Sequence, residues 1–145
     1  MKLYVAGPLF TQADRDFLDG CAQRYEAAGH ECFVPHHKTL DPLHPDTVYR
    51  VDGDGVRGAN VCVAWLDGPV IDDGTACEIG IFAELCRREP DRYVGIIGLV
   101  TDWRTLRRKE AGAVADGLNL FVTGAVRAHG EIAYDLDRVV ELLDE

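Results

Sequence analysis

Short apolar runs alternate with amphipathic stretches along the whole of this 145-residue chain. The clearest run, NVCVAWL at 60–66, is apolar after its first residue, which is typical of a strand covered on both faces of a sheet. Comparable runs predict strands at 2–7, 30–35, 93–100 and at the start of 131–145. Because stretches with helical spacing separate these runs, we expect a doubly wound α/β fold, with a five-stranded parallel sheet and helices on both faces.

Helix boundaries follow from capping residues and from the end of each apolar stripe. Thr11 is a candidate N-cap for a helix over 11–28, and Asp46 for a helix that follows the polar loop after the second strand. Further helices are expected over 75–88 and 117–126 and at the C-terminus. The basic stretch 101–117 follows neither period and stays unassigned. Without an internal repeat, low-complexity segment or linker, residues 1–145 are expected to form a single domain.

Ligand sites in such sheets lie beyond the carboxyl ends of the strands, so the loops that follow the strands are the first candidates for a ligand site. The loop after the third strand leads into DDGTACEIG, where Glu78 stands among apolar residues. One interpretation is a capping box, in which Thr75 caps the helix and Glu78 reaches back to a backbone N–H. The other interpretation is catalysis, because the loop carries more acid than a cap needs, at Asp67, Asp72 and Asp73.

A second carboxylate, Asp52, is expected on the preceding helix, on a turn that faces the same edge of the sheet as Glu78. Paired carboxylates in an apolar crevice are the groups that cleave a glycosidic bond. One attacks or stabilises the anomeric carbon, and the other donates a proton to the leaving group. The residues alone therefore leave both a capping role and a catalytic role open for Glu78.

Two other motifs do not predict a ligand site, because their sequence context does not fit one. Residues 53–58 match G-x-G-x-x-G, but they lie inside the helical stretch before the third strand, whereas a dinucleotide site must follow a strand and open a helix. His36 and His37, with Cys32 and His44 nearby, match no zinc-ligand spacing and indicate a polar loop. We therefore expect no cofactor and no metal.

The formal net charge of −10 and the pI near 4.8 make nucleic acid polymers and anionic membranes poor partners. No apolar run approaches the roughly 18 residues that a membrane span requires. The N-terminal MKLYVAGPLF is too short for a signal peptide and is better explained as a buried strand. Five cysteines without a C-x-x-C pair predict reduced, buried thiols and a cytoplasmic protein.

Four pieces of the chain together resemble the nucleoside 2-deoxyribosyltransferase family: YVAGPLFT, YRVDGDGVRGANVCVAWLDGP, DDGTACEIG and GLNLFV. They occur in the family's order and at close to its spacing, and they cover most of the chain. The resemblance implies a flavodoxin-like, Rossmann-like fold and a ping-pong reaction. In that reaction an enzyme carboxylate attacks C1′ of a 2′-deoxyribonucleoside, the base leaves, and a second base takes the sugar. The stretch 101–117 is longer and more basic than the family pattern.

The resemblance also implies roles for individual residues. Glu78 matches the nucleophile, Asp52 an acid near the departing base, and Tyr4 the tyrosine whose hydroxyl holds the nucleophile in place. Asp72 stands at a position that contacts the base. Asn119 matches an asparagine that a neighbouring subunit contributes to the 5′-hydroxyl, which implies a homo-oligomer with shared active sites. From the residues alone, Tyr4 is equally well explained as a core aromatic and Asn119 as a helix cap.

The loops after the first and third strands add Gly7, Phe10 and Asp73 to the expected substrate site. The first of these loops has no basic residue and the other is acidic, so we predict a neutral 2′-deoxyribonucleoside and a free nucleobase as partners. Transfer is expected to exceed hydrolysis, since Leu9, Phe10 and Trp65 would exclude water. The alternatives are a nucleoside 5′-monophosphate N-glycosidase and a non-catalytic nucleoside-binding module.

Overall fold

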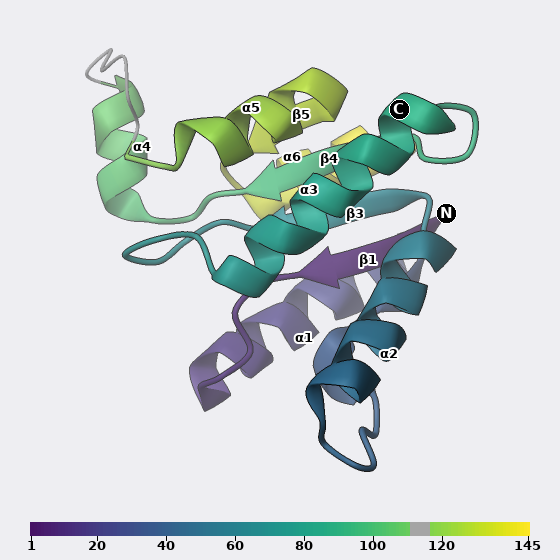
Figure 1. The fold of residues 1–145 in the computed structure, drawn as a ribbon. Helices are drawn as coiled ribbons and strands as arrows, with labels where there is room; N and C mark the ends of the chain where they lie inside the picture. Colours follow the sequence, from purple (N-terminus) through teal and green to yellow (C-terminus); the bar gives the residue numbers. More distant parts are fainter. Residues whose placement is uncertain (111–116) are drawn as a thin grey trace.

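The computed structural model describes residues 1–110 and 117–145, and Figure 1 shows their fold. The strands are β1 (Lys2–Ala6), β2 (Glu31–Phe33), β3 (Val61–Trp65), β4 (Gly95–Leu99) and β5 (Gly130–Ala133). The helices are α1 (Gln12–Ala27), the short 3-10 helix η1 (Pro35–His37), α2 (Pro45–Gly58), α3 (Asp73–Arg88), α4 (Trp103–Glu110), α5 (Leu120–His129) and α6 (Leu136–Asp144). Strands and helices alternate as predicted, except that η1 and α2 both lie between β2 and β3, and α4 and α5 both lie between β4 and β5.

The sheet is parallel throughout, in the order β2-β1-β3-β4-β5. The first strand lies between β2 and β3, so Tyr4 is opposite Phe33 on one side and Cys62 on the other. This is the flavodoxin-like strand order, and the direction of winding reverses beside β1. The prediction of a five-stranded, doubly wound parallel sheet is therefore confirmed. The reversal places a crevice at the carboxyl ends of β1 and β3, where ligands bind in folds of this kind.

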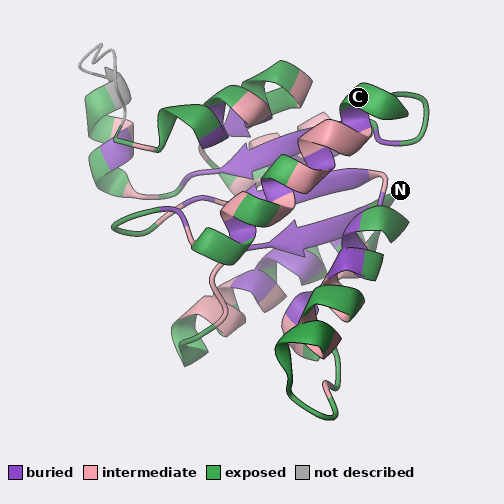
Figure 2. Ribbon diagram, in the orientation of Figure 1, coloured by how far each residue is buried: buried purple, intermediate pink, exposed green. Residues whose placement is uncertain are grey.

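Two apolar cores, one on each face of the sheet, hold the layers together. Successive strand residues point to opposite faces, so Leu3 and Val5 pack with α1 and α6, whereas Tyr4 and Ala6 pack with α2, α3 and α5. Figure 2 shows the central strands β1, β3 and β4 buried over most of their length, with exposed residues along the outer sides of the helices. Burial on both faces explains why the strands are continuous apolar runs in the sequence.

The cap of α1 is confirmed, but the predicted caps of α2 and α3 are wrong. Thr11 caps α1 as expected. His44, not Asp46, is the N-cap of α2, because a proline occupies the first helical position and starts the helix one residue before Asp46. Asp72, not Thr75, is the N-cap of α3, so that helix begins three residues earlier than its capping-box pattern indicates.

The stretch left unassigned by the sequence begins with α4, and its residues 111–116 lie outside the described residues. Trp103 on α4 is exposed, with the guanidinium of Arg107 over its ring. All five cysteines are free thiols, but only three are buried as expected, because Cys32 is half-buried and Cys77 is exposed. In the described parts of the chain, each helix is too short or too polar to cross a lipid bilayer.

Candidate active site

The crevice beside β1 brings a tyrosine on β1 against a glutamate on α3. Tyr4 is fully buried, and its hydroxyl donates a hydrogen bond of 2.5 Å to Oε1 of Glu78. The two residues are 74 positions apart in the sequence. They meet because β1 and β3 are neighbours in the sheet and α3 begins just beyond the end of β3.

The first turn of α3 defines the orientation of Glu78. Oδ2 of Asp72 accepts hydrogen bonds from both the backbone N–H and the hydroxyl of Thr75, each at 2.9 Å. Thr75 is therefore the third residue of α3 and Glu78 the sixth. A capping box requires the glutamate at the third position. The capping interpretation of Glu78 is wrong, and its carboxylate meets Tyr4 instead of the helix's own N-terminus.

Burial in this crevice changes the proton affinity of Glu78. Its pKa is raised from the ordinary 4.5 to about 7, chiefly by burial and further by the carboxylates of Asp52 and Asp72, while the hydrogen bond from Tyr4 opposes the rise. Burial and the Glu78 charge also raise the pKa of the Tyr4 phenol well above its usual range, so the phenol is the hydrogen-bond donor at neutral pH. A strongly shifted carboxyl group in a cleft is typical of functional sites.

Asp52 comes from α2 and lines the same cavity as Glu78. Its Oδ1 is buried and has no hydrogen-bond partner among the described residues. Burial also raises the pKa of Asp52, which favours its protonated form. A buried carboxyl oxygen without a partner needs one from water or a ligand, and a raised pKa suits a carboxyl group to general acid catalysis.

A cavity of about 500 Å³ opens at these carboxylates. It is bounded by the three loops that follow β1, β2 and β3, as the strand-end argument predicts. The expected substrate-site residues that line it are Gly7, Phe10, Asp52, Asp72, Asp73 and Glu78. A second cavity of about 520 Å³ between α2 and α3 shares Asp52 and Glu78 with the first. Both volumes suit a small organic ligand.

Asn119 lies away from this cavity. It is the N-cap of α5, and its Oδ1 accepts hydrogen bonds from the backbone N–H groups of Phe121 and Val122. It lines a different cavity, together with residues 68–71, and does not border the one that contains Glu78. Within one subunit, Asn119 is therefore a helix cap and not part of the cavity that contains Glu78.

Trp65 also lies outside the cavity, although Leu9 and Phe10 line it as expected. The Trp65 ring packs on Phe17 of α1, with ring centroids 4.3 Å apart. Trp65 has the same parity along β3 as the residues that face α1 and α6, so its side chain points to the opposite face of the sheet from Glu78. The expectation that Trp65 helps to exclude water from the site is wrong.

The loop between β2 and α2 contributes wall residues that sequence reasoning did not assign to the site: Pro35, His36, Lys38, Leu40 and Leu43. Their position after a strand indicates that this loop borders the site, but the loop's composition does not reveal which of its residues face the cavity. Lys38 brings a positive charge that the loop after β1 lacks. Its ammonium group lies over the Phe33 ring, 4.6 Å from the centroid.

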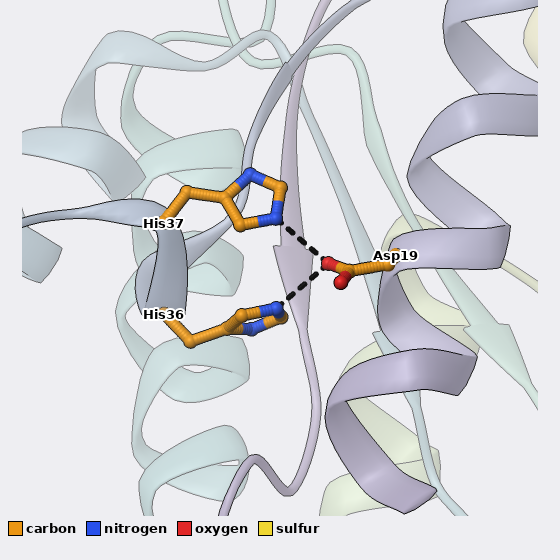
Figure 3. A group of neighbouring side chains, drawn as sticks. All are labelled: Asp19, His36 and His37. Atoms are coloured by element: carbon orange, nitrogen blue, oxygen red, sulfur yellow. Dashed lines mark hydrogen bonds and ion pairs between the residues drawn. The ribbon is translucent and has the colours of Figure 1, made fainter. Parts of the chain in front are cut away.

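Figure 3 shows a hydrogen-bonded cluster of Asp19, His36 and His37. Nε2 of each histidine lies 2.7 Å from Oδ1 of Asp19, which ties η1 to α1. These atoms are close enough together to hold a metal ion. However, Nδ1 of His36 is buried without a partner among the described residues, whereas a histidine that ligates through Nε2 normally donates its other N–H to an acceptor. The geometry fits a tie between η1 and α1 better than a metal centre.

These features define a class: a flavodoxin-like α/β protein whose ligand cavity is built around carboxylates at the switch point of its sheet. The family model described as nucleoside 2-deoxyribosyltransferase matches residues 3–134. The chain therefore belongs to the nucleoside 2-deoxyribosyltransferase family, which is a family of enzymes.

Solved structures resemble the fold over most of the chain. A conserved protein from Enterococcus faecalis is 24% identical, with a TM-score of 0.80, and the match covers 99% of this chain and 97% of that one. A 2-deoxyribosyltransferase from Bacillus psychrosaccharolyticus is 19% identical, with a TM-score of 0.70 and coverage of 97% and 90%. One from Leishmania mexicana is 20% identical, with a TM-score of 0.58 and coverage of 83% and 84%. No curated protein sequence matches the chain significantly.

Proposed function

We propose that the protein transfers 2-deoxyribose between nucleobases, with Glu78 as the nucleophile that attacks C1′ of a 2′-deoxyribonucleoside. The observation that carries this proposal is the 2.5 Å hydrogen bond from the Tyr4 hydroxyl to Oε1 of Glu78, beside a cavity that Glu78 lines. The bond holds one carboxylate oxygen and leaves the other, Oε2, to form the glycosyl ester. Membership of the family supports the same reaction.

In the first half-reaction, a Glu78 oxygen forms a bond to C1′ while the N-glycosidic bond breaks and its electron pair moves to the base nitrogen. Asp52, whose raised pKa favours the protonated form, donates a proton to the departing base. In the second half-reaction, a nitrogen of the acceptor base attacks C1′ and Glu78 leaves as a carboxylate. Asp52 accepts the proton that this nitrogen loses, so the enzyme returns to its starting state without a cofactor.

The proposed donor is a neutral 2′-deoxyribonucleoside. A 5′-phosphate would bring a charge of about −2 into the cavity. Four carboxylates line that cavity: Asp52, Asp72, Asp73 and Glu78. They outnumber the ammonium group of Lys38, which already interacts with the Phe33 ring. Lys38 is nevertheless the feature that would serve the alternative, a 5′-monophosphate N-glycosidase, and this alternative requires a direct test.

The proposed enzyme is a homo-oligomer in which Asn119 completes the site of a neighbouring subunit at the 5′-hydroxyl. Leu120 and Phe121 beside it are 70% and 88% exposed, and adjoining exposed apolar side chains mark interaction surfaces. Mixed oligomers of Asn119→Ala and Glu78→Ala subunits should recover turnover, because one site in each mixed pair then has both residues. Failure to recover after verified subunit exchange would show that each site is built from one chain.

Covalent trapping tests the proposed nucleophile. After incubation with a 2-fluoro-2-deoxy nucleoside, the protein should gain the mass of one sugar, and peptide mapping should locate it on the peptide that contains Glu78. The Glu78→Gln variant, treated identically, should stay unlabelled. Saturable nucleoside binding without any adduct would favour the non-catalytic binding module, and an adduct on another peptide would move the nucleophile elsewhere.

A substrate panel tests the donor and the acceptor. Deoxyinosine, thymidine and deoxycytidine, their 5′-monophosphates and the matching ribonucleosides are each assayed with and without free adenine. The 2′-deoxyribonucleosides should react fastest, and adenine should divert product from free sugar to deoxyadenosine. Faster cleavage of the monophosphates, with no exchange on adding adenine, would make the protein a nucleotide N-glycosidase.

A further inference from the structure

The G-x-G-x-x-G motif at 53–58 lies inside α2, and its middle glycine makes an unusually close contact. A Cβ atom at Gly55 would lie 2.5, 2.6 and 2.7 Å from three carbons of the Phe33 ring. Real Cβ atoms do not approach ring carbons so closely, and an aromatic ring has no flexible end that can yield. A Cβ atom at Gly58, one turn later, would have no such neighbour within 4 Å among the described residues.

Phe33 in turn supports Tyr4. The two residues are register partners on β2 and β1. Their rings stack with centroids 5.4 Å apart and planes inclined by 16°. Tyr4 is fully buried and cannot move into solvent when its neighbour moves. A continuous line of contacts therefore runs from the backbone of α2, through the rings of Phe33 and Tyr4, to the carboxylate of Glu78.

We propose that Gly55 and Phe33 are positioning residues, which hold the Tyr4 ring where its hydroxyl reaches Oε1 of Glu78. The glycine is required because only a residue without a side chain lets α2 approach the Phe33 ring. The motif thus serves close packing behind a carboxylate and not the binding of a pyrophosphate. The expected effect on turnover rests on the proposed role of Glu78, whereas the positioning itself does not.

Displacing the Tyr4 ring would lengthen a short hydrogen bond to a charged acceptor. That bond is the contact that opposes the upward shift of the Glu78 pKa, while burial and the carboxylates of Asp52 and Asp72 cause the shift. Loss of the bond therefore leaves Glu78 less ionised at neutral pH and its carboxylate less well oriented. Misplacement by about 1 Å can reduce a rate on the order of a hundredfold.

The matched pair Gly55→Ala and Gly58→Ala tests the proposal, since both change a glycine of the same helix. Gly55→Ala should lower turnover by about tenfold to a hundredfold. The titration midpoint of the Glu78 carboxyl, followed by carbon-13 NMR, should move to higher pH. Gly58→Ala should change neither, and its Tm should stay level or rise, because alanine is the better helix former.

Equal turnover and equal Glu78 midpoints in the two variants would overturn the proposal. So would a lower Tm for Gly55→Ala with turnover per folded molecule and midpoint unchanged, because the contact would then serve stability alone. If Gly55→Ala does not fold, Phe33→Leu replaces it, and an unmoved midpoint there also overturns the proposal. The NMR midpoint needs no activity, so a shift in Gly55→Ala, together with full activity in Glu78→Gln, would refute the proposed function and leave the positioning intact.

Discussion

The two faces of the sheet are built by the same alternation of residues, yet among the described residues only one face sets a carboxylate against its buried tyrosine. On the α1–α6 face, Tyr25 is 0% exposed within an apolar core. On the opposite face, Tyr4 is also 0% exposed, but its hydroxyl meets the Glu78 carboxylate. A buried tyrosine therefore does not mark a site by itself. The carboxylate that it contacts makes the difference.

The charges of the α1–α6 face lie at its rim. Arg138 on α6 forms ion pairs with Glu131, Glu141 and Glu145, all of them accessible to water. Water and salt screen such pairs, so they add little to stability. In the crevice of the other face, burial raises the pKa of Glu78 to about 7. A charge there costs folding free energy, which is expected where a group is placed for chemistry and not for stability.

The largest effect is expected for Glu78→Gln, which removes the proposed nucleophile. Turnover should fall by at least about a thousandfold, since covalent catalysis is lost while the shape of the side chain is kept. Glu84→Gln on the same helix is the control, because the Glu84 side chain is 44% exposed and pairs only with surface arginines in the described chain. Comparable activity in the two variants, in a steady-state assay of purified protein, would contradict the role of Glu78.

Glu78→Gln should also be more stable than the wild type at pH 8. The folded-state pKa of Glu78 is raised from 4.5 to about 7, so the stability that its protonated form contributes is complete below pH 4.5 and is lost as the pH rises through about 7. Glutamine avoids that loss, by about 1 kcal/mol after allowance for partial solvent access. Denaturant unfolding at pH 4 and pH 8 measures the difference, and an equal gain at both pH values would show that ionisation is not its cause.

Asp52→Asn should have the next largest effect, and it should depend on the leaving group. Turnover of natural nucleosides should fall by about a hundredfold, because a poor leaving base needs protonation as it departs. Nucleosides whose bases leave readily should lose much less. Rates measured on both kinds of substrate distinguish the two roles. If Asp52 were only a binding group, Asp52→Asn would reduce both rates equally.

Tyr4→Phe and Tyr25→Phe compare the two faces directly. Tyr4→Phe removes the hydrogen bond that lowers the Glu78 pKa, so the acid limb of the pH profile of kcat/KM, expected near pH 7, should move upward. The rate at neutral pH should fall about tenfold. Tyr25→Phe should leave both unchanged. Matching profiles for the two variants would mean that the buried hydroxyl on β1 has no special role.

The smallest effect on activity is expected from the apolar core of the α1–α6 face. Val139→Ala removes two buried methyl groups and should lower the free energy of unfolding by about 2 kcal/mol. Turnover per folded molecule should not change, because α6 packs on the face of the sheet opposite the carboxylates. Urea unfolding and an assay corrected for folded protein measure the two quantities, and a parallel loss of activity would show that the faces are coupled.

Much of the fold was predictable from the chain. Apolar runs of strand length, such as 60–66, predicted buried parallel strands, and their alternation with amphipathic stretches predicted the layers. The topology then placed the loops that bound the cavity at the carboxyl ends of β1, β2 and β3. Caps were less predictable, since Thr75 and Asp72 are both good capping residues and only the backbone geometry selects Asp72.

Sequence by itself determined the alternating pattern, the fold class and the presence of Glu78 and Asp52 on helices near one edge of the sheet. Tertiary structure alone decided which side chains touch. Asp19 forms a hydrogen bond with His36, the Phe33 ring stacks on Tyr4, and the same ring packs against the backbone of Gly55. Trp65 turns away from the site because of its parity along β3. The physical reason is that distant residues come into contact through strand order and register, which depend on packing of the whole chain. Local patterns specify only the buried face and the ends of each helix or strand.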